Sequence, residues 1–325
     1  MITFAAMQAL LKFVVVIVWL AQGAAAQDNA RIERMQTAFD SWLDQSNAQG
    51  VAAVAFKGAQ VATLDGGQKP DTPAELASVS KSITAICGAS LVEDGLLAYT
   101  DTVLGRLGRG PDTSVASLVT HSSGLVDDVT QSLMLRSLDK PKDSAPDVLD
   151  AIGPAEGAVG VYAYNNVNYA LLGLLIEDAA NAPYEDTCRQ RVLDPAGATG
   201  MASPRSGASL SWGGWYMIPA DYAALHSYWF STQTEMGSDP FAYPHVEVVE
   251  GVYYGLGTFF RKSRRGHNFW HHGALCMPGR LNIGSFAVTW RSEWSIFVSY
   301  DQCVDWNEMT NLDLALGQAA YGALE

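Results

Sequence analysis

Ser78 and Lys81 form the pattern Ser-x-x-Lys, whose spacing suits a nucleophile and its base. An apolar helix is predicted from about Ser78 to Asp94, and residues three apart lie on one face of a helix. The helix dipole would favour negative charge on the serine oxygen, and a lysine in a dry site can act as a base. The alternative is that Ser78 is only a helix cap. Ser137 and Lys140 have the same spacing but lie in a charged loop, where we expect exposure.

A second candidate group, Tyr164-Asn165-Asn166, precedes an apolar helix predicted over Tyr169–Ala179. A phenol beside an ammonium can pass a proton to a leaving group, which makes Tyr164 a candidate catalytic residue. Asn166 could orient that ammonium and hydrogen-bond a substrate carbonyl. The alternative is a tyrosine packed at a helix entrance beside an asparagine cap.

A third candidate group, His271-His272-Gly273-Ala274, ends a predicted strand. Gly273 would let a substrate lie close to the strand backbone. The N–H of Ala274, together with that of Ser78, could form an oxyanion hole. The alternative is a pair of surface histidines on an edge strand, and we favour that interpretation for His272.

Strand patterns near both ends of the chain surround these groups. One sheet could therefore take strands from both ends, with a helical block inserted between them. The pattern predicts a helix over 30–46, strands over 51–56 and 60–64, a largely helical block over 96–197, aromatic-rich strands over 253–260, 269–275, 283–290 and 294–300, and a closing helix over 307–321.

The composition is that of a globular protein, with 48% hydrophobic and 17% charged residues among 325. The formal net charge of −14 would repel phosphate backbones and anionic lipids, so we expect neither nucleic acid nor a membrane surface as partner. The four cysteines lack Cys-x-x-Cys spacing and histidines at ligand spacing, so we expect no metal site. Cys87, inside an apolar helix, is predicted to be a buried free thiol.

The first 26 residues have the pattern of a secretory signal peptide. Phe13–Ala21 is a short apolar core, and Ala24–Ala26 supplies small residues for cleavage before Gln27. The sequence therefore predicts a mature protein over 27–325 that is periplasmic or secreted and has no membrane span. The alternative is an uncleaved anchor, for which nine apolar residues are short, because about 20 are needed.

Taken in order, the three groups resemble the motifs of the serine β-lactamase and penicillin-binding-protein superfamily, most closely its class C-like branch. The similarity extends from about Val51 to Tyr300. Further matching segments are Leu118–Leu125, Trp212–Gly214, Pro219–Tyr222 and Tyr254–Gly257.

The resemblance implies an α+β fold in which an antiparallel sheet is flanked by helices and carries an inserted all-helical lobe. The α/β part would cover about 27–77 and 205–325, and the lobe about 78–204. It implies no metal or organic cofactor. It also assigns roles: Ser78 as nucleophile, Lys81 as base, Tyr164 and Asn166 as the second motif, His271 as the start of the third, and the amide of Ala274 as oxyanion donor.

One departure from the family concerns His271, because lactamases of this branch usually carry lysine there. A neutral imidazole holds a substrate carboxylate less well than an ammonium does. We therefore rank an esterase acting on a small ester first, a D-amino-acid or D,D-peptidase second and a β-lactamase third. A non-catalytic protein that binds peptidoglycan-like peptides is the alternative from another class.

Two further expectations depend on the implied topology. The strands that end near Leu275 and Tyr300 could finish at the same end of the sheet, which predicts a disulfide between Cys276 and Cys303. Trp215 and Trp270 could line an apolar acyl pocket, with core packing as the alternative.

Overall fold

The computed structural model of the chain describes residues 27–322, so the predicted signal peptide lies outside the described residues. Its main feature is an eight-stranded antiparallel sheet in the order β2-β1-β11-β10-β9-β8-β7-β6. The strands are β1 (Gly50–Phe56), β2 (Ala59–Gly66), β6 (His245–Val249), β7 (Val252–Gly255), β8 (Thr258–Lys262), β9 (His267–Met277), β10 (Leu281–Trp290) and β11 (Trp294–Tyr300).

The two ends of the chain meet in the middle of this sheet, as the strand patterns predicted. β1 pairs with β11 from Gly50 opposite Tyr300 to Phe56 opposite Trp294. Both strands are almost entirely buried, because helices cover both faces of the sheet at this point. Continuous apolar strands such as these are typical of sheets buried on two sides.

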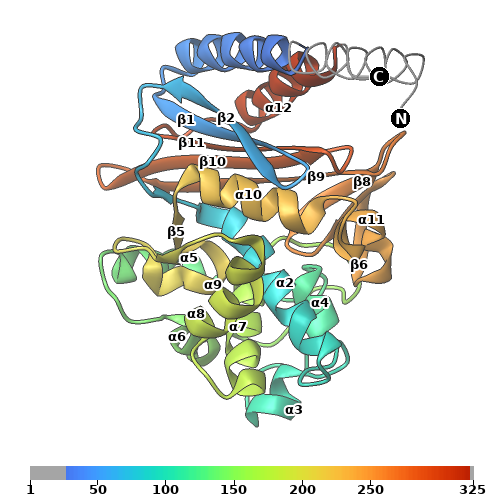
Figure 1. Cartoon of the computed structure of the whole chain (residues 1–325). Coiled ribbons are helices and arrows are strands. Elements are labelled where there is room, and N and C mark those ends of the chain that lie inside the picture. The colour runs from blue at the N-terminus through green and yellow to red at the C-terminus, as the bar shows by residue number, and fades with distance from the viewer. Residues whose placement is uncertain (1–26, 323–325) are drawn as a thin grey trace, which may run out of the picture.

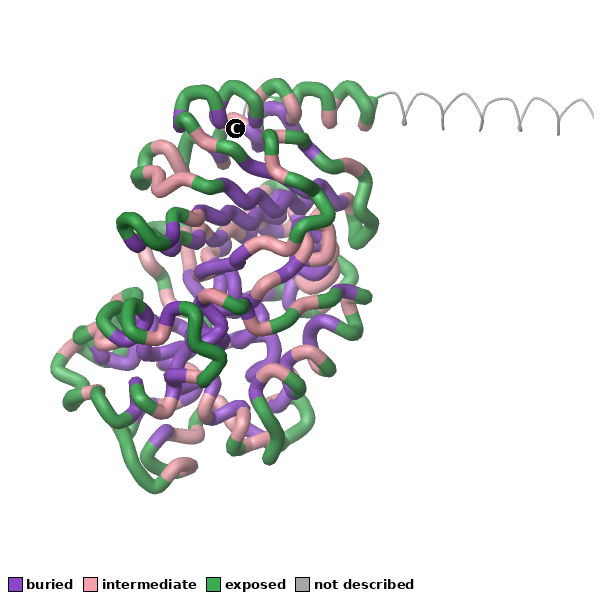
Figure 2. The backbone as a smooth tube through the Cα atoms, turned by 90° about the vertical axis from the view of Figure 1, so that its left-hand side faces the viewer, coloured by how far each residue is buried: buried purple, intermediate pink, exposed green. Residues whose placement is uncertain are grey.

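Helices form a layer on each face of the sheet (Figure 1). The helix over 27–46 and α12 (Trp306–Tyr321) run antiparallel on one face, since Trp42 Nε1 donates to Glu308 O at 2.8 Å and Arg34 Nε donates to Ala319 O at 3.1 Å. α10 (Pro219–Phe230) covers β1 and β11 on the other face. Figure 2 shows the buried strands between these layers.

The remaining helices, apart from α11, gather in a lobe beyond α10 (Figure 1). The lobe centres on α2 and α7, which contact one another and are buried on nearly all sides. A small sheet of β3 (Ala74–Glu75), β5 (Trp215–Met217) and β4 (Met201–Ala202) joins the lobe to the rest. The helices are α2 (Ser80–Glu93), α3 (Val103–Leu107), α4 (Val115–Val119), α5 (Thr130–Ser137), α6 (Ala145–Ala151), α7 (Asn166–Ala180), α8 (Tyr184–Cys188), α9 (Leu210–Gly213) and, before β6, α11 (Glu235–Ser238).

The strand predicted over 253–260 is instead two strands, β7 and β8, joined by a tight turn. Leu256 and Gly257 have positive φ angles of 54° and 73° in this turn. A Cβ on Gly257 would lie 2.3 Å from Lys81 O, so the turn packs directly against the start of α2. Glycine is required here because both the backbone conformation and the available space exclude a side chain.

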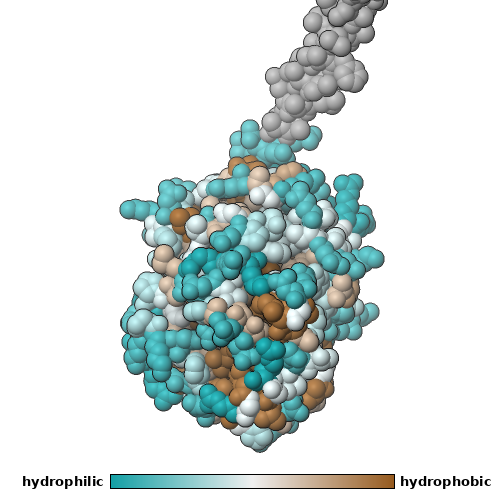
Figure 3. Space-filling model, turned by 60° about the horizontal axis from the view of Figure 1, so that its bottom comes forward, coloured by the Kyte–Doolittle hydropathy of each residue, from teal (hydrophilic) through white to brown (hydrophobic). Residues whose placement is uncertain are grey.

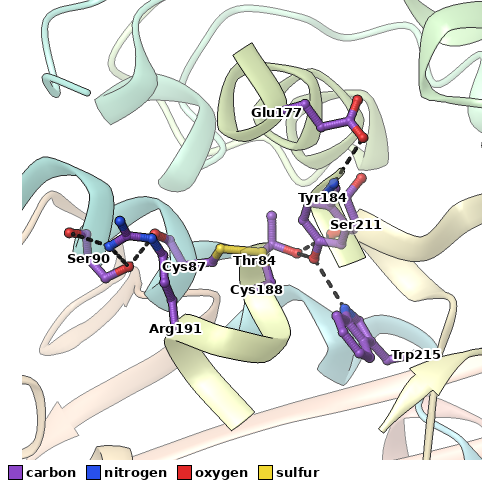
Figure 4. The surroundings of a disulfide bond; sticks show 9 residues. All are labelled: Thr84, Cys87, Ser90, Glu177, Tyr184, Cys188, Arg191, Ser211 and Trp215. Atoms are coloured by element: carbon purple, nitrogen blue, oxygen red, sulfur yellow. Dashed lines mark hydrogen bonds between the residues drawn. A yellow bond between two sulfur atoms is a disulfide. The ribbon is translucent and has the colours of Figure 1, made fainter. Parts of the chain in front are cut away.

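Two disulfides connect distant elements. Cys276 and Cys303 are bonded, with Cα atoms 5.9 Å apart, which confirms the predicted pair. The prediction of a free thiol at Cys87 is wrong, because Cys87 of α2 is bonded to Cys188 at the end of α8, 101 residues later (Figure 4). The sequence gives no signal for this pair, since it depends on how two separate helices pack.

Candidate active site

Ser78 lies in a short 3-10 turn, Ala77–Val79, immediately before α2 rather than inside it. Ala77 adopts a positive φ of 49°, a conformation that costs a non-glycine residue about 1–2 kcal/mol. Ala77 and Val79 are buried, while Ser78 between them is partly exposed. The strained turn therefore directs the serine away from the core.

Two hydroxyl groups from other elements hold this turn in place. Ser285 Oγ of β10 donates to Leu76 O at 2.6 Å, and Tyr222 OH of α10 donates to Val79 O at 2.8 Å. The sequence interpretation did not identify Ser285, because a single serine in an apolar strand carries no distinctive signal. The sheet and α10 thus fix the position of the candidate nucleophile.

Lys81 is fully buried one turn after Ser78. Its Nζ lies 3.4 Å from Ser78 Oγ, and it donates to Asn166 Oδ1 at 2.7 Å and to Trp212 O at 2.8 Å. Burial lowers the pKa of Lys81 to about 7, against the opposing effect of the Asp128 carboxylate. A substantial fraction of the lysine is therefore neutral near pH 7 and can accept a proton.

Tyr164 lies beside both groups. The Lys81 ammonium is 4.9 Å from the centre of its ring, and Tyr164 lines the larger pocket together with Ser78. Desolvation of the hydroxyl raises the pKa of Tyr164, which an interaction with Ser78 only partly offsets. The phenol therefore keeps its proton and can relay one between Ser78 and a bound group.

Asp128 completes the arrangement, although the sequence interpretation did not identify it. Asn166 Nδ2 donates to Asp128 Oδ2 at 3.1 Å, which fixes the amide so that its oxygen faces Lys81. Asp128 is 38 residues from Asn166 in the chain. As one of 34 acidic residues, it could not be singled out without the structure.

His271 is buried and carries no positive charge. Its Nδ1 donates to His272 O at 2.6 Å, and Tyr254 OH donates to its Nε2 at 3.3 Å. Burial, reinforced by the nearby Lys81 charge, lowers the pKa of His271 to about 3. The interpretation of His272 as a surface residue is wrong, because its ring stacks on Phe286 with centres 4.4 Å apart and is only partly exposed.

Gly273 brings the backbone of β9 against the candidate nucleophile. A Cβ at this position would lie 2.9 Å from Ser78 N and 2.8 Å from Leu76 O. Only glycine permits this approach, which places the next residue, Ala274, at the rim of the cleft. The geometric requirement for glycine thus comes from the turn that carries Ser78 rather than from a substrate.

The cleft extends to both sides of Ser78 as two pockets of about 580 Å³ and 190 Å³. All of the sequence-predicted site residues except the buried Lys81 line the larger pocket. Neither pocket is lined by arginine or lysine. The larger also includes Tyr162, Val248, Phe259, Trp306 and Met309, and the smaller includes Met134, Leu135, Trp212, Leu275 and Met277.

The two tryptophans proposed for an acyl pocket do not line it. Trp215 is fully buried and donates to Tyr184 OH at 3.2 Å, and Trp270 stacks on Phe259. Trp212, quoted only as part of a family segment, lines the smaller pocket instead. A larger cavity of about 720 Å³ around Thr113 lies elsewhere in the lobe and contains none of the candidate catalytic residues.

Within residues 27–322, no cluster of histidine, cysteine and acidic side chains could hold a metal ion. No helix in the same part of the chain has the length and apolar character needed to cross a membrane. From the side of the helical lobe, the surface is mainly hydrophilic with separate hydrophobic patches (Figure 3).

The family model described as Beta-lactamase matches residues 33–279 of the chain. Penicillin-binding protein 4* of Bacillus subtilis (strain 168) is 33% identical over 132 residues, which cover 38% of this chain and 29% of that protein. The putative penicillin-binding protein PbpX of the same strain is 26% identical over 133 residues, which cover 40% of this chain and 32% of that protein. The chain thus spans less than a third of the length of either relative.

Solved structures share the fold at low sequence identity. The D-amino acid amidase from Ochrobactrum anthropi SV3 has a TM-score of 0.71 at 16% identity, covering 89% of this chain and 98% of that one. The penicillin-binding protein from Bacillus halodurans has a TM-score of 0.69 at 19% identity, covering 85% and 98%. The D-stereospecific amidohydrolase from Streptomyces sp. has a TM-score of 0.69 at 17% identity, covering 89% and 98%.

Proposed function

Because this chain belongs to the beta-lactamase family, we propose that it is a serine hydrolase that forms an acyl-enzyme at Ser78. The observation that carries the proposal is the environment of Lys81. Its Nζ is buried, lies 3.4 Å from Ser78 Oγ and has a pKa lowered to about 7. A buried lysine whose lowered pKa lets it lose its proton near neutral pH, beside a partly exposed serine, has the properties of a general base.

The reaction begins when Ser78 Oγ attacks the substrate carbonyl and its proton passes to neutral Lys81, directly or through Tyr164. The N–H groups of Ser78 and Ala274 donate to the oxyanion that develops. The C–O or C–N bond then breaks, and Tyr164 donates a proton to the leaving group. Lys81 then returns a proton to Tyr164. Water attacks the acyl-enzyme in the second half, and Ser78 regains its proton.

The pockets favour a substrate without a carboxylate. No arginine or lysine lines either pocket, and His271 is neutral, so a buried substrate carboxylate would lose its hydration without gaining a partner. A small uncharged ester is therefore the proposed substrate. An amide or D-amino-acid peptide is the second candidate, which the similarity to the D-amino acid amidase and the D-stereospecific amidohydrolase favours.

The test compares p-nitrophenyl butyrate hydrolysis by the purified protein and its Ser78→Ala variant. We expect turnover in the parent and none above background in Ser78→Ala. Ser137→Ala is the matched control, because Ser137 belongs to the other Ser-x-x-Lys pattern, and it should retain full activity. No turnover of esters or D-amino-acid amides by the parent would favour the non-catalytic binding protein.

The proposed place of action is the periplasm or the medium. Two features support it: the leader-like pattern of residues 1–26, and two disulfides, which persist mainly in oxidising compartments.

A further inference from the structure

The basic residues of this chain are unevenly distributed. The sequence has 20 lysines and arginines against 34 acidic residues. A basic end is nevertheless formed where the β8–β9 turn, the β10–β11 turn, the last turn of α12 and the first turns of the helix over 27–46 come together. The basic residues of this end are Arg31, Arg34, Arg261, Lys262, Arg264, Arg265 and Arg291.

A pocket of about 310 Å³ lies at the centre of the basic end. Arg261, Lys262, Arg264 and Arg291 line it, together with Tyr321. The Arg291 guanidinium lies 4.1 Å from the centre of the Tyr321 ring. This cation–π contact restrains the guanidinium group of Arg291, which is partly exposed.

Part of this positive charge has no ion-pair partner within residues 27–322, because none of the ion pairs there includes Arg261, Lys262 or Arg291. Burial raises the pKa of Asp313, and the charge of Arg261 partly offsets this effect. The Asp313 carboxylate also accepts a hydrogen bond from Trp290 Nε1 at 3.1 Å. The pocket therefore keeps an excess of positive charge on a chain that is acidic overall.

The N-terminal part of the chain joins the domain at the same end. Arg31 lies 5.8 Å from the Tyr321 ring and 4.9 Å from the Trp294 ring, and Arg34 contacts Ala319. The first described residues therefore lie at the same end of the domain as the basic pocket.

We propose that the basic end docks on a membrane surface rich in anionic phospholipid, with a lipid phosphate entering the pocket. Guanidinium groups match phosphate oxygens in bidentate geometry. The overall charge of −14 does not oppose this, because charges farther away than about 8 Å are largely screened at physiological salt.

The position of the pocket is compatible with activity at a membrane. From His267, at the basic end, β9 runs to Gly273, at the candidate active site. At ~3.3 Å per residue, this separates the two by about 20 Å. The cleft would thus stay open while the basic end contacts lipid.

The experiment is cosedimentation of the purified protein with phosphatidylcholine vesicles, with and without phosphatidylglycerol, at about 0.15 M salt. We expect binding that requires phosphatidylglycerol. The double variant Arg261→Gln/Lys262→Gln should bind about 30-fold more weakly, since each basic residue near an anionic surface contributes about fivefold. The variant Lys69→Gln/Lys140→Gln makes the same change of charge elsewhere and should bind like the parent.

Ester hydrolysis and thermal unfolding of each variant show that its fold is retained. Equal binding to both kinds of vesicle, or equal loss in the two double variants, would overturn the proposal. Binding of soluble glycerol phosphate in calorimetry without binding to phosphatidylglycerol vesicles would also overturn it and would identify a free phosphate ester as the ligand.

Discussion

The protonation of Lys81 depends on two opposing influences, burial and the Asp128 carboxylate. Burial is the larger and lowers the pKa of Lys81 to about 7, while Asp128 raises it. Asp128 reaches the lysine through Asn166, which hydrogen-bonds to both. Asp128, which lines neither pocket, thus affects the fraction of neutral base at a given pH.

This balance predicts the pH dependence of activity. Neutral Lys81 is the active form, so kcat/KM should rise with pH through an apparent pKa of about 7. Asp128→Asn removes a charge that favours the ammonium, so this rise should move to lower pH. Plots of the acylation rate and of kcat/KM against pH, from pre-steady-state and steady-state kinetics, would show the change. A shift of equal size in Asp127→Asn, or a shift to higher pH, would contradict the account.

Gly273 provides a second test at the level of one residue. An added Cβ would lie 2.9 Å from Ser78 N and 2.8 Å from Leu76 O, and both are backbone atoms with little room to move. Gly273→Ala should therefore lower stability by about 1–3 kcal/mol, seen as a Tm lower by several degrees, and abolish hydrolysis. Gly153→Ala, where nothing lies within 4 Å, should change neither. A fully active Gly273→Ala variant would contradict this geometry.

At the scale of elements, the Cys276–Cys303 disulfide joins the end of β9 to the segment before α12. Trp306 and Met309 at the start of α12 line the larger pocket. The capping box formed by Asp305 and Glu308 fixes where this helix begins. The disulfide and the cap together hold one wall of the cleft.

Removal of this disulfide should affect substrate binding more than chemistry. We expect Cys276→Ala/Cys303→Ala to raise KM for the ester with little change in kcat, because α12 moves while Ser78 and Lys81 stay in place. Stability should fall by about 3–4 kcal/mol, the chain-entropy value for a loop of this length. The variant Cys87→Ala/Cys188→Ala removes the disulfide that connects α2 to α8 inside the lobe. This variant should lower Tm without raising KM. An unchanged KM in the first variant would contradict the assignment of this wall.

The elements that the sequence predicted well are those with a strong local signal. β10 and β11 are continuous apolar strands, and α12 follows a capping box. The sequence interpretation missed β6, whose exposed and half-buried residues alternate at the sheet edge, and merged β7 with β8 across a turn. Tertiary contacts with Lys81, rather than local propensity, define that turn.

For the whole molecule, the candidate site depends on three separate parts of the chain. Ser78 and Lys81 come from the start of the lobe, Tyr164 and Asn166 from its middle, and Gly273 from the C-terminal half of the sheet. Motif order and family resemblance predicted these residues. Asp128, Ser285 and the Cys87–Cys188 pair required the three-dimensional packing, because their types are common and their partners lie far away in sequence.

Net charge was informative only in part at this scale. The value of −14 led us to expect neither nucleic acid nor a membrane surface as partner, but it concealed the basic end around Arg261 and Arg291. A sum over the sequence cannot show how charges are arranged once the two ends of the chain fold together.

The central claim is that Ser78 becomes acylated. The most direct measurement is to mix the protein with p-nitrophenyl butyrate, quench with acid within the first turnovers, and locate the acyl group by peptide mass spectrometry. The account predicts a butyryl group on the peptide that contains Ser78. Hydrolysis without a label on that peptide, or with the label on another residue, would contradict it.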